Sequence, residues 1–251
     1  MHIIKHLENF ILNSSIKKIS LVLFTILLFK TGVWYIPNID MSVSMTKSPF
    51  VNPFNPPSYL LWNWLVPFLG WVFGAQEKWS FFLLHLFFSI GFIGIMIKLI
   101  SSRLSDKSAR CSLILLVVLP VSATSFYWVG MDSATLFLMA AAFVFPRFFT
   151  WSIFIGMLLG MHHFEQAFFS STSLFLAILI ARKTKTPIDN SPSWAIGMII
   201  GTLLGKLLLI CLFKHWNILT EFDRFSLLQH KIYIYIYNYL CFIFSQCFFQ
   251  Y

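Results

Sequence analysis

Segment 160–166 holds the densest group of side chains that can do chemistry. It contains His162, His163 and Glu165, followed at once by Gln166. If the segment is helical, His162 shares a face with Glu165 and with Gln166, because residues three and four apart are neighbours on a helix. Two imidazoles and a carboxylate at a membrane turn can bind a metal ion, donate to a phosphate or move a proton. A merely solvated turn is the alternative interpretation.

Two acids elsewhere in the chain are further candidates. Asp40 is the only acid in segment 36–75, and it is predicted to be either a general base or an exposed loop acid. Asp132 follows Gly130 at a predicted helix start, where capping the helix is the default role of an Asp. Either acid would be needed to complete a metal centre with residues 162–165, because such a centre has three or four ligands. A divalent cation is therefore left open as a cofactor, and no ligand set is assigned.

Four basic side chains lie within apolar runs, and one of them, Lys98, can extend to the cytoplasmic surface. Lys206 stands well inside its run, where a charged group costs about 2.5–3.5 kcal/mol on insertion scales, so we expect an acidic partner or a phosphate beside it. His85 is interpreted as a hydrogen-bonding group between helices or as part of a substrate site. Lys30 is interpreted as a side chain that reaches the membrane surface. Together with the acids and histidines above, Lys206, His85 and Lys30 fall in one half of the predicted membrane region, which predicts a polar cavity facing outward.

The elements that must position these groups are predicted from the composition. Hydrophobic residues make up 58% of the 251 residues and charged residues 11%, against about 25% charged residues in a soluble domain. A soluble fold is therefore excluded, and the net charge of +9 is not assigned to a nucleic-acid partner. The predicted partner is membrane lipid, and the predicted fold class is an all-α transmembrane bundle of about seven or eight spans forming one domain.

Apolar runs near the ~20 residues that a bilayer needs define the spans. The predicted spans are 19–36, 79–100, 111–129, 132–146, 149–161, 164–181 and 194–213. Segment 59–74 is short, rich in Trp and interrupted by Pro67, so it is predicted to be an interfacial or re-entrant helix. Segment 232–251 is either a last span or the product of a frameshift or truncated gene, and both alternatives stay open.

Basic residues in the short loops predict the orientation. With the N-terminus in the cytoplasm, all basic loops fall on the cytoplasmic side, as the positive-inside rule requires. The residues concerned are Lys17, Lys18, Arg103, Lys107, Arg110, Arg147, Arg182, Lys183 and Lys185. We therefore expect a multi-pass protein of a bacterial inner (plasma) membrane, with its first span retained as an anchor.

Glycines at intervals of four residues predict where helices pack closely. Gly156 and Gly160 form one such set, and Gly197, Gly201 and Gly205 form another. Spacing of four places small residues on one helix face, where two backbones can approach each other. This pattern concerns assembly of the bundle and not its chemistry.

The layout of residues 19–181 resembles the GT-C class of membrane glycosyltransferases, which use polyprenyl-phosphate-linked sugars. The likeness is carried by Asp40 in a long first outer loop, by segment 56–60 (Pro-Pro-Ser-Tyr-Leu), and by segment 131–136 (Met-Asp-Ser-Ala-Thr-Leu) at the start of the fourth span.

This resemblance implies inverting transfer of a sugar from a polyprenyl-phosphate donor on the non-cytoplasmic side. It implies that Asp40 is the catalytic base and that Asp132 supports the site. The leaving lipid phosphate would be stabilised by Lys206 or by protonated His162 or His163. Two alternatives remain: a transporter or lipid flippase, and a non-catalytic or truncated membrane protein.

Overall fold

The computed structural model describes residues 10, 13–31, 39–54, 59–119, 122, 132–145, 148–185 and 191–218, and of residues 30, 31, 59 and 60 only the backbone. Every regular element in these ranges is a helix, which confirms the all-α prediction. The helices are α2 (Ile16–Thr31), α3 (Ile39–Lys47), the 3₁₀ helix η1 (Tyr59–Trp62), α4 (Leu65–Val72), α5 (Lys78–Arg103), α6 (Asp106–Val118), α8 (Asp132–Ala142), α9 (Phe149–His162), α10 (Phe164–Lys183) and α11 (Pro192–His215).

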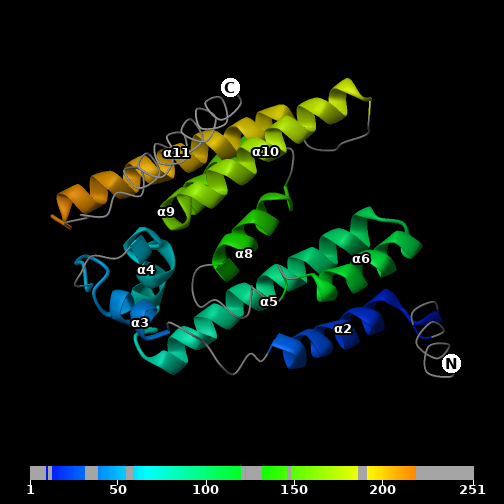
Figure 1. Ribbon diagram of the computed structural model, residues 1–251, viewed down its shortest axis with the longest axis horizontal. Coiled ribbons are helices and arrows are strands. Elements are labelled where there is room, and N and C mark those ends of the chain that lie inside the picture. The colour runs from blue at the N-terminus through cyan, green and yellow to red at the C-terminus, as the bar shows by residue number, and fades with distance from the viewer. Residues whose placement is uncertain are drawn as a thin grey trace, which may run out of the picture.

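The long helices form two groups, with α8 between them (Figure 1). One group contains α9, α10 and α11, and the other contains α2, α5 and α6. Helix α8 packs on α5 on one side and on α9 on the other. The short helices α3 and α4 pack on each other and cover one end of the molecule (Figure 1).

Three helices are long and apolar enough to cross a membrane. Helices α5, α10 and α11 have 26, 20 and 24 residues, and at about 1.5 Å per residue each reaches the ~30 Å of a hydrocarbon core. Helices α8 and α9 are apolar but shorter. The membrane character of the chain is thus supported, while the number of spans beyond these three stays a prediction.

Several predicted boundaries move in the structure. The loop predicted at 101–110 is reduced to the turn Leu104–Ser105, because α5 continues to Arg103 and α6 begins at Asp106. Pro67 does not interrupt segment 59–74, since it stands in the first turn of α4, where a helix tolerates proline. The long outer loop predicted around Asp40 contains the helix α3.

Some predictions fall on residues outside the described ranges. These are the tail 232–251, segments 32–38 and 123–131 at the ends of predicted spans, residues 56–58 of the quoted Pro-Pro-Ser motif, Met131, Arg147 and the side chain of Lys30.

The predicted glycine faces pack against each other between α9 and α11, the most extensively packed pair of helices in the described chain. A Cβ atom added to Gly160 would strike the carbonyl oxygen of Thr202, and one added to Gly201 would strike that of Ile153. One added to Gly205 would strike the carbonyl oxygen of Met157. These neighbours are backbone atoms, which cannot move aside as a side chain can. The tight-packing prediction is confirmed, and we call this contact the glycine seam.

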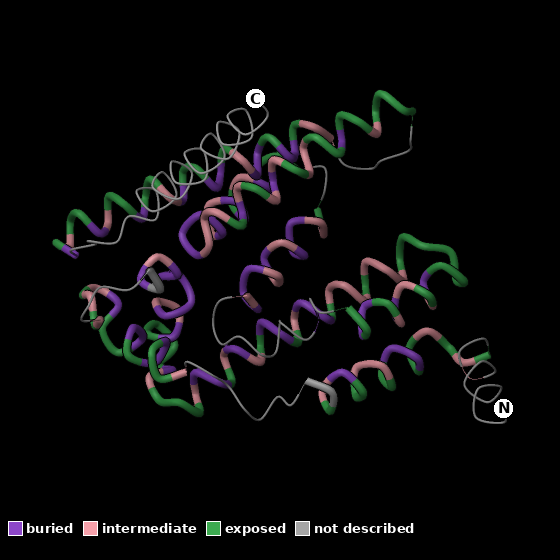
Figure 2. Tube along the Cα trace, in the orientation of Figure 1, coloured by how far each residue is buried: buried purple, intermediate pink, exposed green. Residues whose placement is uncertain are grey.

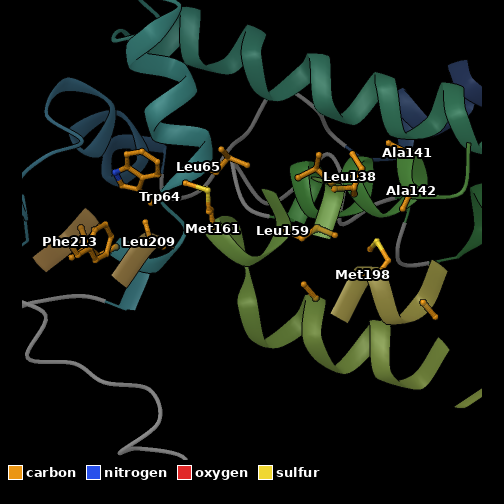
Figure 3. Close-up of a cluster of buried hydrophobic side chains, with 14 of the residues drawn as sticks. Trp64, Leu65, Leu138, Ala141, Ala142, Leu159, Met161, Met198, Leu209 and Phe213 are labelled. Carbon is orange, nitrogen blue, oxygen red and sulfur yellow. The ribbon is translucent and has the colours of Figure 1, made fainter. Parts of the chain in front are cut away.

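The main apolar core lies beside the glycine seam. Figure 3 shows a row of buried side chains that joins the start of α4, at Trp64 and Leu65, to α8, α9 and α11, with Met161, Met198 and Phe213 among them. Figure 2 shows that the buried residues gather where α3, α4, α8 and the end of α9 meet, whereas the turn between α5 and α6 is exposed. The end covered by α3 and α4 therefore offers polar side chains a more buried environment.

Lys47, Lys78 and Lys214 lie near α3 and α4, whereas the basic residues of the predicted cytoplasmic loops gather at the opposite end. The start of α2, the turn between α5 and α6 and the end of α10 all lie there (Figure 1). These segments carry Lys17, Lys18, Arg103, Arg182 and Lys183. The arrangement agrees with the charge pattern from which the orientation was predicted.

Substitution in the glycine seam tests its tightness. We expect Gly201→Ala to lower the stability of the protein by about 1–3 kcal/mol, because its methyl group overpacks against the Ile153 carbonyl. The matched control is Gly94→Ala on α5, where an added Cβ meets nothing within 4 Å. Alanine favours a helix over glycine by roughly 1 kcal/mol, so this control should be neutral or stabilising. The measurement is unfolding in detergent, and equal stability of the two variants would contradict the seam.

Candidate functional site

A sharp break separates α9 from α10 at His163. This residue ends α9, donating its backbone N–H to the carbonyl of Leu159 at 2.8 Å, and its own carbonyl accepts from Ala167 at 3.0 Å. The chain reverses direction here (Figure 1). The predicted shared helical face of His162, Glu165 and Gln166 is therefore wrong, because His162 ends one helix and Glu165 lies in the first turn of the next.

The break brings His163, rather than His162, next to Glu165. The Nδ1 atom of His163 lies 3.9 Å from Oε2 of Glu165, close enough for an ion pair when the imidazole is protonated. Neither side chain is fully exposed. His162 is completely buried at the end of α9, where the helix dipole favours a positive charge. The two histidines thus differ: His163 faces an acid at the turn, and His162 belongs to the interior.

Asp132 joins His163 from a different helix. It lies half-buried in the first turn of α8, where a carboxylate is favoured by the free backbone N–H groups. Its carboxylate interacts electrostatically with His163. Two acids, Asp132 of α8 and Glu165 of α10, therefore act electrostatically on the imidazole of His163. We call Asp132, His163 and Glu165 the acid–histidine cluster.

His85 lies next to this cluster and is fully buried on α5. Its Nδ1 atom and the Oγ atom of Ser133 share a hydrogen bond of 3.1 Å. Ser133 follows Asp132 directly, so the bond ties the first turn of α8 to α5. The prediction of His85 as a hydrogen-bonding group between helices is confirmed. Its action on a substrate stays a prediction.

Lys206 is held against aromatic rings at the end of the glycine seam. Its Nζ atom lies 3.4 Å from the ring centroid of Trp62 and 5.6 Å from that of Phe164. The backbone nitrogen of Lys206 also lies 3.0 Å from the point that a Cβ atom on Gly160 would occupy. Cation–π attraction offsets part of the cost of placing an ammonium group in an apolar run. Phe164 stands between His163 and Glu165 in the sequence. The ammonium group of Lys206, on α11, therefore lies beside the turn that carries the acid–histidine cluster.

Asp40 forms an ion pair apart from the acid–histidine cluster, at the end of the molecule covered by α3 and α4. Its Oδ1 atom lies 2.7 Å from Nζ of Lys78, and both side chains are well exposed. The pair ties the first turn of α3 to the first turn of α5. An exposed ion pair of this kind contributes little stability. The carboxylate of Asp40 is therefore paired with the Lys78 side chain and does not belong to the acid–histidine cluster.

No metal centre is assigned. Within the described ranges, no group of three or more His, Cys, Asp and Glu side chains is arranged to hold a metal ion. For the acid–histidine cluster we therefore consider two kinds of chemistry, proton transfer and stabilisation of charge.

Two residues of the site escaped the sequence analysis. Trp62 was included only as part of an aromatic segment, although it forms the closest ring contact of Lys206. Ser133 was quoted only as a neighbour of Asp132, although it binds His85. Both contacts join residues far apart in the chain, so no local spacing indicates them.

A double-mutant cycle tests the contact between Lys206 and Trp62. We expect a coupling energy of about 0.5–2 kcal/mol between Lys206→Met and Trp62→Leu, the range of cation–π pairs from exposed to desolvated sites. The measurement is reversible unfolding in mixed detergent micelles. Lys206→Met combined with Phe164→Leu is the control, and it should give a smaller coupling because that ring is farther away. Equal couplings in the two cycles would refute the assignment.

No protein-family model, curated protein or solved structure matches the chain.

Proposed function

We propose that the chain is a multi-pass membrane protein that transfers a sugar from a polyprenyl-phosphate donor on the non-cytoplasmic side of the membrane. The observation that carries the proposal is the acid–histidine cluster with Lys206 beside its turn. An acid, a proton-carrying imidazole and a cation held near one another are the groups that such a transfer needs.

The proposed orientation places the N-terminus in the cytoplasm and the acid–histidine cluster outside. It is supported by the gathering of basic residues at the end of the molecule away from α3 and α4. In this arrangement α2, α5, α6, α8, α9, α10 and α11 correspond to the seven predicted spans. The aromatic residues of η1 and α4 then lie at the outer interface, where Trp is favoured.

The proposed reaction is an inverting displacement. The hydroxyl of the acceptor gives its proton to the carboxylate of Asp132, and its oxygen forms a bond to the anomeric carbon of the sugar. The bond from that carbon to the phosphate oxygen breaks, and the phosphate leaves with the electron pair. Lys206, or protonated His163, stabilises the negative charge of the phosphate. Glu165, whose carboxylate lies 3.9 Å from His163, would pair with the imidazolium when it forms.

The environment of the two candidate acids favours Asp132 over Asp40 as the base. Asp132 is half-buried beside an imidazole, whereas the carboxylate of Asp40 is exposed and neutralised by Lys78. The resemblance implied Asp40 as the base, and we propose for it the role of orienting α3 over the site. His85 and Ser133 position Asp132 by fixing the start of α8.

The test is transfer activity in vesicles that contain polyprenyl-phosphate-linked sugars. We expect Asp132→Asn to lower the rate by about 10²-fold or more, which is the usual contribution of a general base. The matched control is Asp106→Asn, because Asp106 also stands in the first turn of a helix but is exposed and paired with Arg110. The control should retain full activity.

Three outcomes would contradict the proposal. Full activity of Asp132→Asn would remove this carboxylate from the chemistry. Movement of the labelled lipid across the membrane by the unaltered protein, with no sugar transferred, would identify a flippase instead. Absence of both transfer and movement would favour a non-catalytic membrane protein.

A further inference from the structure

A groove of about 580 Å³ runs between α2 and α5, at the end of the molecule away from the acid–histidine cluster. Its α2 wall includes Lys17, Ser20, Leu21 and Phe24. These residues share one helix face, because they recur at intervals of three and four. The groove therefore separates part of this face from α5, although Phe24 still packs against the apolar cluster that contains Ile93.

The α5 wall of the groove is equally regular. It consists of Ile90, Ile93, Gly94, Ile97 and Ser101, which again fall on one helix face. From the first to the last of them the wall extends about 16 Å along the helix at 1.5 Å per residue. The hydrocarbon region of one leaflet is about 15 Å thick, which is half of the ~30 Å core of a bilayer. The groove thus has the length of one acyl chain in one leaflet.

The polar groups of the groove are confined to one of its ends. Lys17 stands in the first turn of α2 and Ser101 in the last turn of α5, and these two helix ends lie together (Figure 1). Ser20 lies one turn further along α2 and is 8% exposed. The hydroxyl oxygens of Ser20 and Ser101 are buried without a hydrogen-bond partner among the described residues. A buried hydroxyl without a partner costs free energy unless a ligand satisfies it.

We propose that this groove binds one acyl chain of an anionic membrane phospholipid, whose phosphate is held by Lys17 and by the hydroxyls of Ser20 and Ser101. The apolar walls match a hydrocarbon chain, and the single cationic end matches a negatively charged headgroup. A wholly apolar occupant would leave the hydroxyls of Ser20 and Ser101 unsatisfied. The proposal does not depend on the proposed sugar transfer, because none of its residues belongs to the acid–histidine cluster.

Gly94 offers a direct way to fill the groove. A Cβ at this position meets no atom within 4 Å, so the Gly94→Leu side chain starts from open space and extends into the groove. Leu21→Trp is a second filling variant, from the opposite wall, at a position that is 67% exposed. The matched control is Ala177→Leu, which adds similar bulk to an exposed position of α10 outside the groove.

The experiment uses the full chain in phosphatidylcholine vesicles doped with phosphatidylglycerol that carries a photoreactive group on one acyl chain. After illumination, cross-linked peptides are mapped by mass spectrometry. We expect cross-links to the peptides of α2 and α5, reduced at least fivefold by Gly94→Leu and by Leu21→Trp and unchanged by Ala177→Leu. Unfolding temperatures of all variants confirm that they are folded.

The headgroup is tested separately with Lys17→Gln. We expect this change to lower cross-linking by the phosphatidylglycerol probe about fivefold, which is the contribution of one lysine near an anionic surface. Cross-linking by a photoreactive phosphatidylcholine probe should be weaker and unaffected by Lys17→Gln. Cross-links that persist in both filling variants, or that fall mainly on α10, would overturn the groove as a lipid site. Equal labelling by the two probes would overturn the anionic headgroup.

Discussion

Direct backbone contact between α9 and α11 is the constraint on which the arrangement of the polar groups depends. Side chains larger than hydrogen cannot fit at Gly160, Gly201 or Gly205, because each faces a backbone carbonyl of the other helix. In lipid no hydrophobic force drives two apolar helices together, so close van der Waals packing must hold them. The glycine seam supplies that packing and fixes the register of the two helices.

This register determines which groups meet at the end of the seam. Because Gly160 contacts the backbone of Lys206, the turn at His163 is held beside the cation on α11. The hydrogen bond between His85 and Ser133 fixes the start of α8 and hence Asp132. The acid–histidine cluster is therefore assembled from three separately anchored helices, while the opposite end of the bundle carries basic residues and an apolar groove.

The sequence predicted the elements better than their contacts. Spacing of four identified both glycine faces, but a face alone does not say which other helix it meets. The spans 149–161 and 164–181 predicted the break at His163, but not that Asp132 of α8 would interact with His163 there. The ring of Trp62 over Lys206 joins residues 144 positions apart, and the α2–α5 groove arises where side chains fail to meet. Packing between residues far apart in the chain decides these contacts, and the local sequence pattern does not reveal which residues will meet.

The proposed orientation puts the acid–histidine cluster and the basic residues on opposite sides of the membrane, with the cluster outside the cytoplasm. Its most direct test is labelling with a membrane-impermeant maleimide after replacement of the native cysteines. Gln166→Cys and Ser105→Cys both introduce an exposed thiol, the first beside Glu165 and the second in the turn between α5 and α6. We expect Gln166→Cys to be labelled in intact cells and Ser105→Cys only after the membrane is opened. The reverse result, or labelling of both from the same side, would contradict this orientation.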